Sequence, residues 1–393
     1  MDKTPLNHRK ELANVILVYV NCKPLTNWEV EEFYSLTNSA GYNVAGYIFQ
    51  QREKPDGRYY IGLGKLNDLK SVSQATESSK IIFYNELRGN QFFNLEKELG
   101  VEVIDRTMLI IEIFSRNAVS NEGKLQVELM YKKKMLPRIM GQGLFMSNQG
   151  GGGTGGTGAR RGIGEQQKEL DKRTIKNEIK LLEKKLEKLS EERAIRRKNR
   201  EKNRCLTISL VGYTNAGKTT LMNVLSHTNS EAKDQLFVTL DPLSRRISTI
   251  MRREILLTDT VGFISNLPHE FIKAFKSTLE ETISSDLILH VVDGASPVAY
   301  EQYNIVNSVL KSIGASDVPT ITVVNKSDCG IFSFVPHSDN FVTISAKNNI
   351  NLDSLIGLIN KYLIKIIETE KTINDTSNFI ELFEEKSPTA LIK

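Results

Sequence analysis

The chain has 393 residues, 40% hydrophobic and 25% charged, which is ordinary for a soluble globular protein of two or three domains. Its 52 basic residues barely exceed its 47 acidic ones, so an overall polycation is excluded, although the charges are unevenly distributed. Three distant cysteines, Cys22, Cys205 and Cys329, exclude a disulfide framework, and no apolar run approaches the roughly 20 residues of a membrane helix. We therefore expect a soluble, cytoplasmic protein with no membrane span.

Residues 14–117 alternate short apolar runs with helical patterns. The apolar runs predict strands at residues 14–20, 44–49, 81–84 and 101–104. The helix after the first strand is expected to begin near Thr26, with Glu29 suitably placed for its N-terminus. Strands separated by helices indicate right-handed βαβ units, so a small parallel α/β domain is predicted for residues 1–120.

Two glycines, Gly62 and Gly64, lie between the second predicted strand and the next helix. Their backbone N–H groups could approach an anion, but an ordinary strand-to-helix turn is the favoured explanation. No phosphate-loop motif supports a second nucleotide site, such as one for ATP, in this domain.

Residues 121–204 predict two helical segments joined by a glycine-rich run, GGGGTGGTGARRGIGE, at residues 150–165. In the second segment, apolar residues recur at steps of four and three, which is the seam of a coiled coil. These seam residues are Ile175, Ile179, Leu182, Leu186 and Leu189. The apolar residues of the first segment are the nearest partner, so we predict a hairpin arm of antiparallel helices with the glycine run at its tip.

Beyond Leu189 the second segment becomes strongly basic. Basic residues in the glycine run, and Lys132, Lys133, Lys134 and Arg138 on the first segment, add to this charge and favour a phosphate-rich partner over a merely solvated helix face. No aromatic platform for base stacking accompanies them, so recognition of RNA shape and backbone is expected. The RNA-binding candidates are Arg160, Arg161, Arg193, Arg196, Arg197, Lys198 and Arg200.

The clearest motif, GYTNAGKT, follows an apolar run at residues 206–211 that predicts a buried strand, and a helical pattern follows it. It fits the phosphate-binding pattern G-x-x-x-x-G-K-[ST], in which backbone N–H groups and a helix N-terminus surround the β-phosphate. Lys218 is expected to bridge the β- and γ-phosphates, and the Thr219 hydroxyl to bind Mg²⁺. The predicted nucleotide contacts here are Gly212, Tyr213, Thr214, Asn215, Ala216, Gly217, Lys218, Thr219 and Thr220.

Three further elements follow in order along predicted strands. After the strand at residues 255–258, Asp259 would hold the metal through water, and Gly262 would offer its N–H to the γ-phosphate. After the strand at residues 320–324, the carboxylate of Asp328 would accept from N1–H and N2 of guanine and so select GTP over ATP. Backbone N–H groups near residue 346 suit the guanine O6. The remaining predicted contacts are Thr260, Val261, Asn325, Lys326, Ser327, Ser345, Ala346 and Lys347.

A second threonine ligand for Mg²⁺ is expected between residues 220 and 259. Thr239 lies in the segment FVTLD and is our choice, although Thr228 and Thr249 compete on position. The nucleotide contacts predicted for this segment are Phe237, Val238, Thr239, Leu240 and Asp241. These elements together predict a guanine-nucleotide switch domain with a mostly parallel sheet at residues 205–370, and residues 371–393 are expected to form a C-terminal tail.

The residue after DTVG bears on hydrolysis. A glutamine often stands there and orients the attacking water, but this chain has Phe263, whose ring cannot make the required hydrogen bonds. The catalytic group is therefore unknown, and we expect slow hydrolysis of GTP to GDP that a partner stimulates. Arg245, Arg246 and His269 are candidates for polar assistance, whereas His290 is expected to be a core residue.

The segments GYTNAGKT, DQLFVTLDP, LLTDTVGFISNLPHE and GKLQVEL, with the glycine-rich stretch ending in RRGIGE, resemble the HflX family of GTPases over about residues 14–365. This resemblance implies an N-terminal α/β domain, a helical hairpin, a P-loop GTPase domain, and association with the large ribosomal subunit. Some members are implicated in splitting stalled or dormant ribosomes. The glycine-rich stretch is longer here than is usual, and residues 371–393 match nothing in the family pattern.

Two functions remain open. In the first, a GTPase that is monomeric when free binds the large ribosomal subunit and its RNA, and acts in ribosome splitting, rescue or recycling under stress. In the second, the arm is an RNA- or protein-binding lever of an assembly factor, and hydrolysis only resets the switch.

Overall fold

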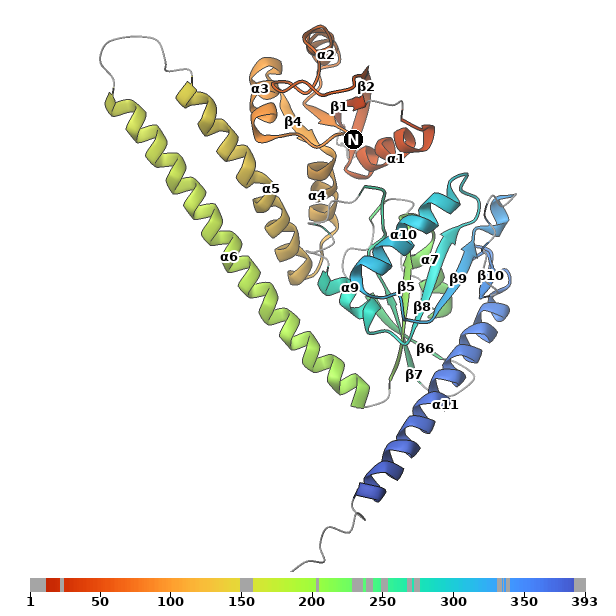
Figure 1. The fold of residues 1–393 in the computed structure, drawn as a ribbon. Helices are drawn as coiled ribbons and strands as arrows, with labels where there is room; N and C mark the ends of the chain where they lie inside the picture. Colours follow the sequence, from red (N-terminus) through yellow and green to blue (C-terminus); the bar gives the residue numbers. More distant parts are fainter. Residues whose placement is uncertain are drawn as a thin grey trace, which may run out of the picture. The chain divides into compact units, whose positions relative to one another are not determined.

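The computed structural model describes residues 12–21, 25–148, 158–202, 205–227, 236–237, 243–248, 254–266, 271, 276–330, 334, 336 and 340–384. The chain divides into two compact units. The first comprises residues 1–196, 233–241 and 267–275, and the second comprises residues 197–232, 242–266 and 276–393. Each unit is built around its own sheet (Figure 1).

The first unit contains a four-stranded parallel sheet in the order β2-β1-β3-β4, which confirms the predicted α/β fold. Its strands are β1 (Ala13–Asn21), β2 (Tyr42–Gln51), β3 (Lys80–Phe83) and β4 (Glu102–Asp105). The helices between and after them are α1 (Asn27–Ser39), α2 (Leu63–Ala75), α3 (Gly89–Leu99) and α4 (Arg106–Asn117). Both faces of β1 are apolar and buried, as expected for a parallel sheet covered on both sides.

The start of α1 and the turn at Gly62 can be compared with the sequence predictions. The backbone N–H of Thr26 donates to Glu29 Oε2 at 2.9 Å and so caps α1. The N–H of Gly62 donates to Gln50 Oε1 at 2.9 Å, so a side chain of the same unit already satisfies it. The structure therefore favours the ordinary turn at Gly62 over an anion site.

Two long helices, α5 (Asn121–Asn148) and α6 (Gly158–Lys202), run side by side and antiparallel (Figure 1). The predicted seam is confirmed, since Leu182 is buried and the other four seam residues are less exposed than most of their neighbours. Ion pairs also join the helices, with Lys132 Nζ at 2.9 Å from Glu178 Oε2 and Lys133 Nζ at 2.7 Å from Glu183 Oε1. One expectation was wrong: α6 begins at Gly158, so Arg160 and Arg161 lie in its first turns rather than in a loop. Arginine is a good helix former, which favours this extension.

The second unit contains a six-stranded sheet in the order β10-β9-β8-β5-β7-β6. Only β6 runs antiparallel to its neighbour, so the predicted mostly parallel sheet is confirmed. The strands are β5 (Leu206–Gly212), β6 (Leu243–Ser248), β7 (Glu254–Asp259), β8 (Leu287–Asp293), β9 (Thr320–Asn325) and β10 (Phe341–Thr343). The helices are α7 (Lys218–Leu225), α9 (Lys276–Ile283), α10 (Ala299–Ile313), the short η1 (Ser327–Cys329) and α11 (Leu352–Glu384).

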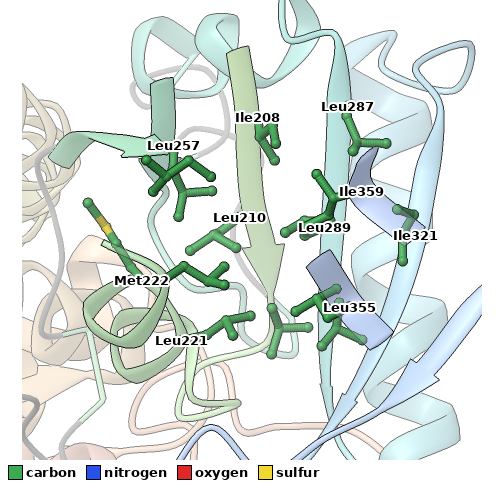
Figure 2. Close-up of a cluster of buried hydrophobic side chains, with 14 of the residues drawn as sticks. Ile208, Leu210, Leu221, Met222, Leu257, Leu287, Leu289, Ile321, Leu355 and Ile359 are labelled. Atoms are coloured by element: carbon green, nitrogen blue, oxygen red, sulfur yellow. The ribbon is translucent and has the colours of Figure 1, made fainter. Parts of the chain in front are cut away.

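The core of this unit forms where α7 and α11 pack on the sheet (Figure 2). Ile208 and Leu210 of β5 are fully buried and lie in one cluster with Met222 of α7. Helix α11 contributes residues spaced four apart, namely Leu355, Ile359, Leu363 and Ile367. This packing fixes β5 and α7, and therefore the loop that joins them.

Helix α11 continues to Glu384, so residues 371–384 of the expected tail continue a helix. Strand β6 is a second feature that the sequence did not indicate, because its LSRRIS segment is mostly polar. No helix in the described ranges is both long and apolar enough to cross a bilayer.

Candidate functional site

The loop between β5 and α7 makes two close approaches that require glycine. A Cβ on Gly212 would lie 2.2 Å from the carbonyl oxygen of Val291, which is a backbone atom that cannot move aside. Gly217 has φ of +91°, and a Cβ there would lie 2.3 Å from Asn325 Nδ2. Both glycines of the GYTNAGKT motif therefore allow the loop to fold tightly against β8 and the end of β9.

Lys218 lies at the start of α7, and its side chain is buried. Its Nζ donates to the carbonyl oxygens of Gly212 at 3.1 Å and Tyr213 at 2.9 Å. Burial lowers the pKa of Lys218 to about 8, although the carboxylate of Asp259 opposes this shift. The loop therefore holds a desolvated cation beside backbone N–H groups at a helix N-terminus, which is an arrangement suited to phosphate.

A hydroxyl and a carboxylate meet next to this cation. The Thr219 hydroxyl donates to Asp259 Oδ2 at 2.8 Å, and Asp259 is fully buried at the end of β7. Oxygen ligands of this kind fit Mg²⁺. Across the described residues, no three His, Cys, Asp or Glu side chains gather as a metal cluster.

The segment after Asp259 is held against the phosphate loop. The backbone N–H of Phe263 donates to the carbonyl of Gly212 at 3.2 Å, and its carbonyl accepts from the N–H of Thr214 at 2.7 Å. The hydroxyl of Tyr213 accepts from the N–H of Ser265 at 2.6 Å. The ring of Phe263 is buried, so this residue acts as an apolar anchor and supplies no polar group.

The residues predicted for guanine also come together. Asn325 Nδ2 donates to the carbonyl of Ala216 at 2.9 Å, and its Oδ1 accepts from the N–H of Ala346 at 3.0 Å. Ser345 donates from Oγ to Asp328 Oδ1 at 2.5 Å. This hydrogen bond holds the pKa of Asp328 below its usual value, so the carboxylate remains ionised. Asn325 thus joins the phosphate loop, the NKSD segment and the ISAK segment.

Sequence reasoning missed Asp293, which ends β8. Its Oδ2 lies 2.8 Å from Nζ of Lys326, and its Oδ1 accepts from the N–H of Ala295 at 3.1 Å. Lys326 itself has φ of +65°, which is rare for a residue with a side chain. The available signal was the acidic residue that ends the buried strand LILHVVD, at the sheet edge where the motifs meet.

The structure also gives the surroundings of other predicted residues. Phe237 belongs to the first unit, where its ring contacts Phe114 at 4.6 Å and its carbonyl accepts from Asn117 Nδ2 at 2.7 Å. Arg245 and Arg246 lie on the edge strand β6, in register with Leu257 and Leu256. The predicted residues that lie outside the described ranges are Val238, Thr239, Leu240, Asp241 and His269.

His290 is confirmed as a core residue. Its ring is 1% exposed and stacks on Tyr303 at 4.8 Å. Burial lowers its pKa to about 3, the charge of Lys218 adds to this effect, and a hydrogen bond with Asn307 opposes it. The imidazole is therefore neutral at physiological pH.

The basic residues of the arm differ from the expectation. Arg193 forms an ion pair with Glu122 of α5, and its side chain is only 15% exposed, so it stabilises the helix pair and is not a free RNA ligand. Lys134 pairs with Asp105 and Glu86, and Arg138 pairs with Glu96. Lys198 is exposed, and its role in RNA binding stays a prediction. The other candidates, whose side chains lie outside the described set, are Arg160, Arg161, Arg196, Arg197 and Arg200.

Three family models match consecutive parts of the chain. They are the GTP-binding GTPase N-terminal family at residues 27–115, the GTP-binding GTPase Middle Region at residues 117–200, and the 50S ribosome-binding GTPase family at residues 207–326. Among solved structures, the crystal structure of the SsGBP and GDP complex is similar, with a TM-score of 0.51 and 27% identity. That match covers 90% of this chain and 99% of the other.

Relatives that span nearly the whole chain complete the comparison. GTPase HflX of Caldanaerobacter subterraneus is 44% identical over 92% of this chain and 82% of its own length. GTPase HflX of Escherichia coli is 39% identical over 85% of this chain and 79% of its own length. The phosphate loop, the NKSD segment and the long helical pair thus stand in a sequence shared with these proteins, and the chain belongs to the HflX family of GTPases.

Proposed function

We propose that this protein binds GTP with Mg²⁺, hydrolyses it slowly when alone, and in its GTP state associates with the large ribosomal subunit. There it acts in ribosome splitting, rescue or recycling. The observation that carries the proposal is Asn325, which joins the phosphate loop to the guanine segments in a domain that matches a 50S ribosome-binding GTPase family.

In this proposal each motif has one task. Backbone N–H groups of residues 217–219, at the start of α7, hold the α- and β-phosphates, and the ammonium of Lys218 moves from the loop carbonyls to the β- and γ-phosphates. Thr219, Thr239 and Asp259 would hold Mg²⁺, Asp259 through water. The metal supplies charge neutralisation on the phosphates.

Base selection falls to Asp328. Its ionised carboxylate accepts from N1–H and N2 of guanine, and the Ser345 hydroxyl fixes its orientation. Adenine offers neither donor at this edge, so GTP binds and ATP does not. The same geometry predicts weak binding of inosine nucleotides, which lack the N2 amino group.

The helical arm provides the ribosome contact. Lys198 on the basic end of α6 is exposed, and Arg160 and Arg161 lie in the first turns of that helix. Arginine and lysine contacts with phosphates release counterions, so subunit binding is expected to weaken steeply as salt rises.

The first test is GTP turnover by the purified protein, alone and with isolated large subunits, together with co-sedimentation in GTP and in GDP. We expect turnover to rise at least tenfold and co-sedimentation to require GTP. Unchanged turnover together with no GTP-dependent co-sedimentation would overturn the ribosomal role. Sedimentation of whole ribosomes with the protein then separates splitting, which yields free subunits, from the assembly-factor alternative, which does not.

A charge-reversal pair tests the arm. Arg160→Glu with Arg161→Glu is expected to abolish subunit binding while GDP affinity stays within about twofold. Lys176→Glu with Lys180→Glu is the matched control. These lysines are exposed on the same helix, between Arg160 and Arg161 at its start and the basic run beyond Leu189. Equal loss in both variants would show that net charge, and not the tip, controls binding.

A further inference from the structure

The hydroxyl of Thr214, the third residue of the phosphate loop, has no hydrogen-bond partner among the described residues. The Thr214 side chain is 7% exposed, so water does not compensate for the missing partner. A buried hydroxyl without a hydrogen bond costs about 1–3 kcal/mol, and such groups persist where a function needs them.

Thr214 lies close to Gly262 and Lys218, the two residues expected to contact the γ-phosphate. A Cβ added to Gly262 would lie 3.0 Å from Thr214 Cα, 3.0 Å from Thr214 Cγ2 and 3.0 Å from Lys218 Nζ. Thr214, Gly262 and Lys218 therefore enclose one small space. The Gly262 N–H and the Lys218 ammonium are the groups expected on the γ-phosphate, so the Thr214 side chain, through its Cγ2 methyl, borders the space expected for that phosphate.

Thr214 is also held firmly in place. Its N–H donates to the carbonyl of Phe263 at 2.7 Å, which ties it to the DTVG segment. The Phe263 ring is buried and offers no hydrogen bond to water. The neutral imidazole of His290 is buried in a stack with Tyr303, and Arg245 and Arg246 lie on β6 in register with residues before Asp259. Of the polar groups that the described residues place beside Gly262, Thr214 is thus the one suited to the water.

We infer that Thr214 is a catalytic residue of GTP hydrolysis in this protein, an inference that rests on the proposed GTPase activity. A hydroxyl can accept and donate at once. Its oxygen accepts a hydrogen bond from the attacking water, and its O–H donates a hydrogen bond to a γ-phosphate oxygen while keeping its proton. The water oxygen bonds to the γ-phosphorus, the bond from that phosphorus to the bridging oxygen breaks, and GDP leaves with the electron pair. The protons of the water remain with the released phosphate.

The test compares Thr214→Val, which keeps the shape of the side chain and removes the hydroxyl, with Thr214→Ser, which restores the hydroxyl. Single-turnover hydrolysis of bound GTP is expected to slow roughly 10- to 100-fold in Thr214→Val and to stay within about threefold of the parent in Thr214→Ser. A second readout is the gain in GDP affinity that aluminium fluoride produces by mimicking the transferring phosphate. This gain should disappear in Thr214→Val and remain in Thr214→Ser.

A control and the opposing results complete the design. Thr322→Val changes a buried threonine of β9 that has no role in the site, and is expected to hydrolyse GTP as the parent does. Hydrolysis by Thr214→Val within about twofold of the parent, or equal losses in Thr214→Val and Thr214→Ser, would overturn the inference. A parent that binds GTP without hydrolysing it would overturn the proposed function as well, so the two failures are distinguishable.

Discussion

Asp105 and Asp259 are both buried aspartates that end a parallel strand, one in each unit. Asp105 accepts from the N–H of Met108 at 2.9 Å and lies 3.3 Å from the ammonium of Lys134. Asp259 instead accepts from the hydroxyl of Thr219 at 2.8 Å. The comparison teaches that burial at a strand end does not by itself mark a site. A helix cap and a paired cation indicate a structural carboxylate, whereas the hydroxyl partner of Asp259 is itself a predicted metal ligand, which places this carboxylate beside the expected Mg²⁺ site.

The same contrast extends to the loops after the strands. In the first unit, Gln50 satisfies the N–H of Gly62 at the start of α2. In the second unit, the hydroxyl of Thr214 in the loop before α7 is buried without a hydrogen-bond partner among the described residues. Two sheets of the same parallel class therefore differ in whether their polar groups are already paired within the fold.

The largest expected effect is on stability in the first unit. Asp105→Ala removes the cap of α4 and one partner of Lys134, whose side chain is 11% exposed, so we expect the free energy of unfolding to fall by about 3 kcal/mol. Urea unfolding followed by circular dichroism measures this loss. Asp105→Asn keeps an oxygen acceptor for Met108 and should lose about half as much. A loss below about 1 kcal/mol in Asp105→Ala would contradict the structural assignment.

Asp259→Asn should show the opposite pattern. Asparagine can still accept from Thr219, so stability should change by less than about 1 kcal/mol, while the affinity for GTP in Mg²⁺ falls about tenfold or more. Titration with a fluorescent GTP analogue, in Mg²⁺ and in EDTA, measures the effect. The parent should bind more tightly in Mg²⁺ and the variant should not. If both respond equally to Mg²⁺, Asp259 is not part of the metal site.

The phosphate-binding part of the site could be predicted from the sequence, because its functional residues are neighbours in the chain. The phosphate loop places its glycines, Lys218 and Thr219 within eight residues after a buried strand, and the structure has this arrangement. The parallel strands could also be predicted, because strands buried on both faces form continuous apolar runs in the sequence. Strand β6 could not be predicted, because it is an edge strand with one core residue, Ile247, and its sequence therefore carries little hydrophobic signal.

The pairing of charges could not be predicted from the sequence. Arg193 lies in a basic run, yet its partner Glu122 is 71 residues away in the sequence. Lys134 and its partner Asp105 belong to different elements, and Asp293 and Lys326 follow different strands. A local charge pattern shows which residues are charged, but tertiary contacts decide which of them remain available to a ligand.

The smallest expected effect concerns a third kind of buried group, a titratable side chain kept neutral. The pKa of His290 is about 3 in the folded protein and about 6.5 in an unfolded chain. Between these values the unfolded state binds a proton that the folded state does not, so stability is lost as pH falls below 6.5. Between pH 7.5 and pH 5.5 this loss amounts to about 1.4 kcal/mol.

Urea unfolding at both pH values, for the parent and for His290→Gln, isolates this contribution, because the other titrating groups are common to the two proteins. We expect stability to fall by about 1.4 kcal/mol less in the variant than in the parent. Equal losses would mean that His290 takes up a proton within the fold. It would then resemble Asp105, a buried charge with its own partner, and the distinction between paired and neutral buried groups would fail at this position.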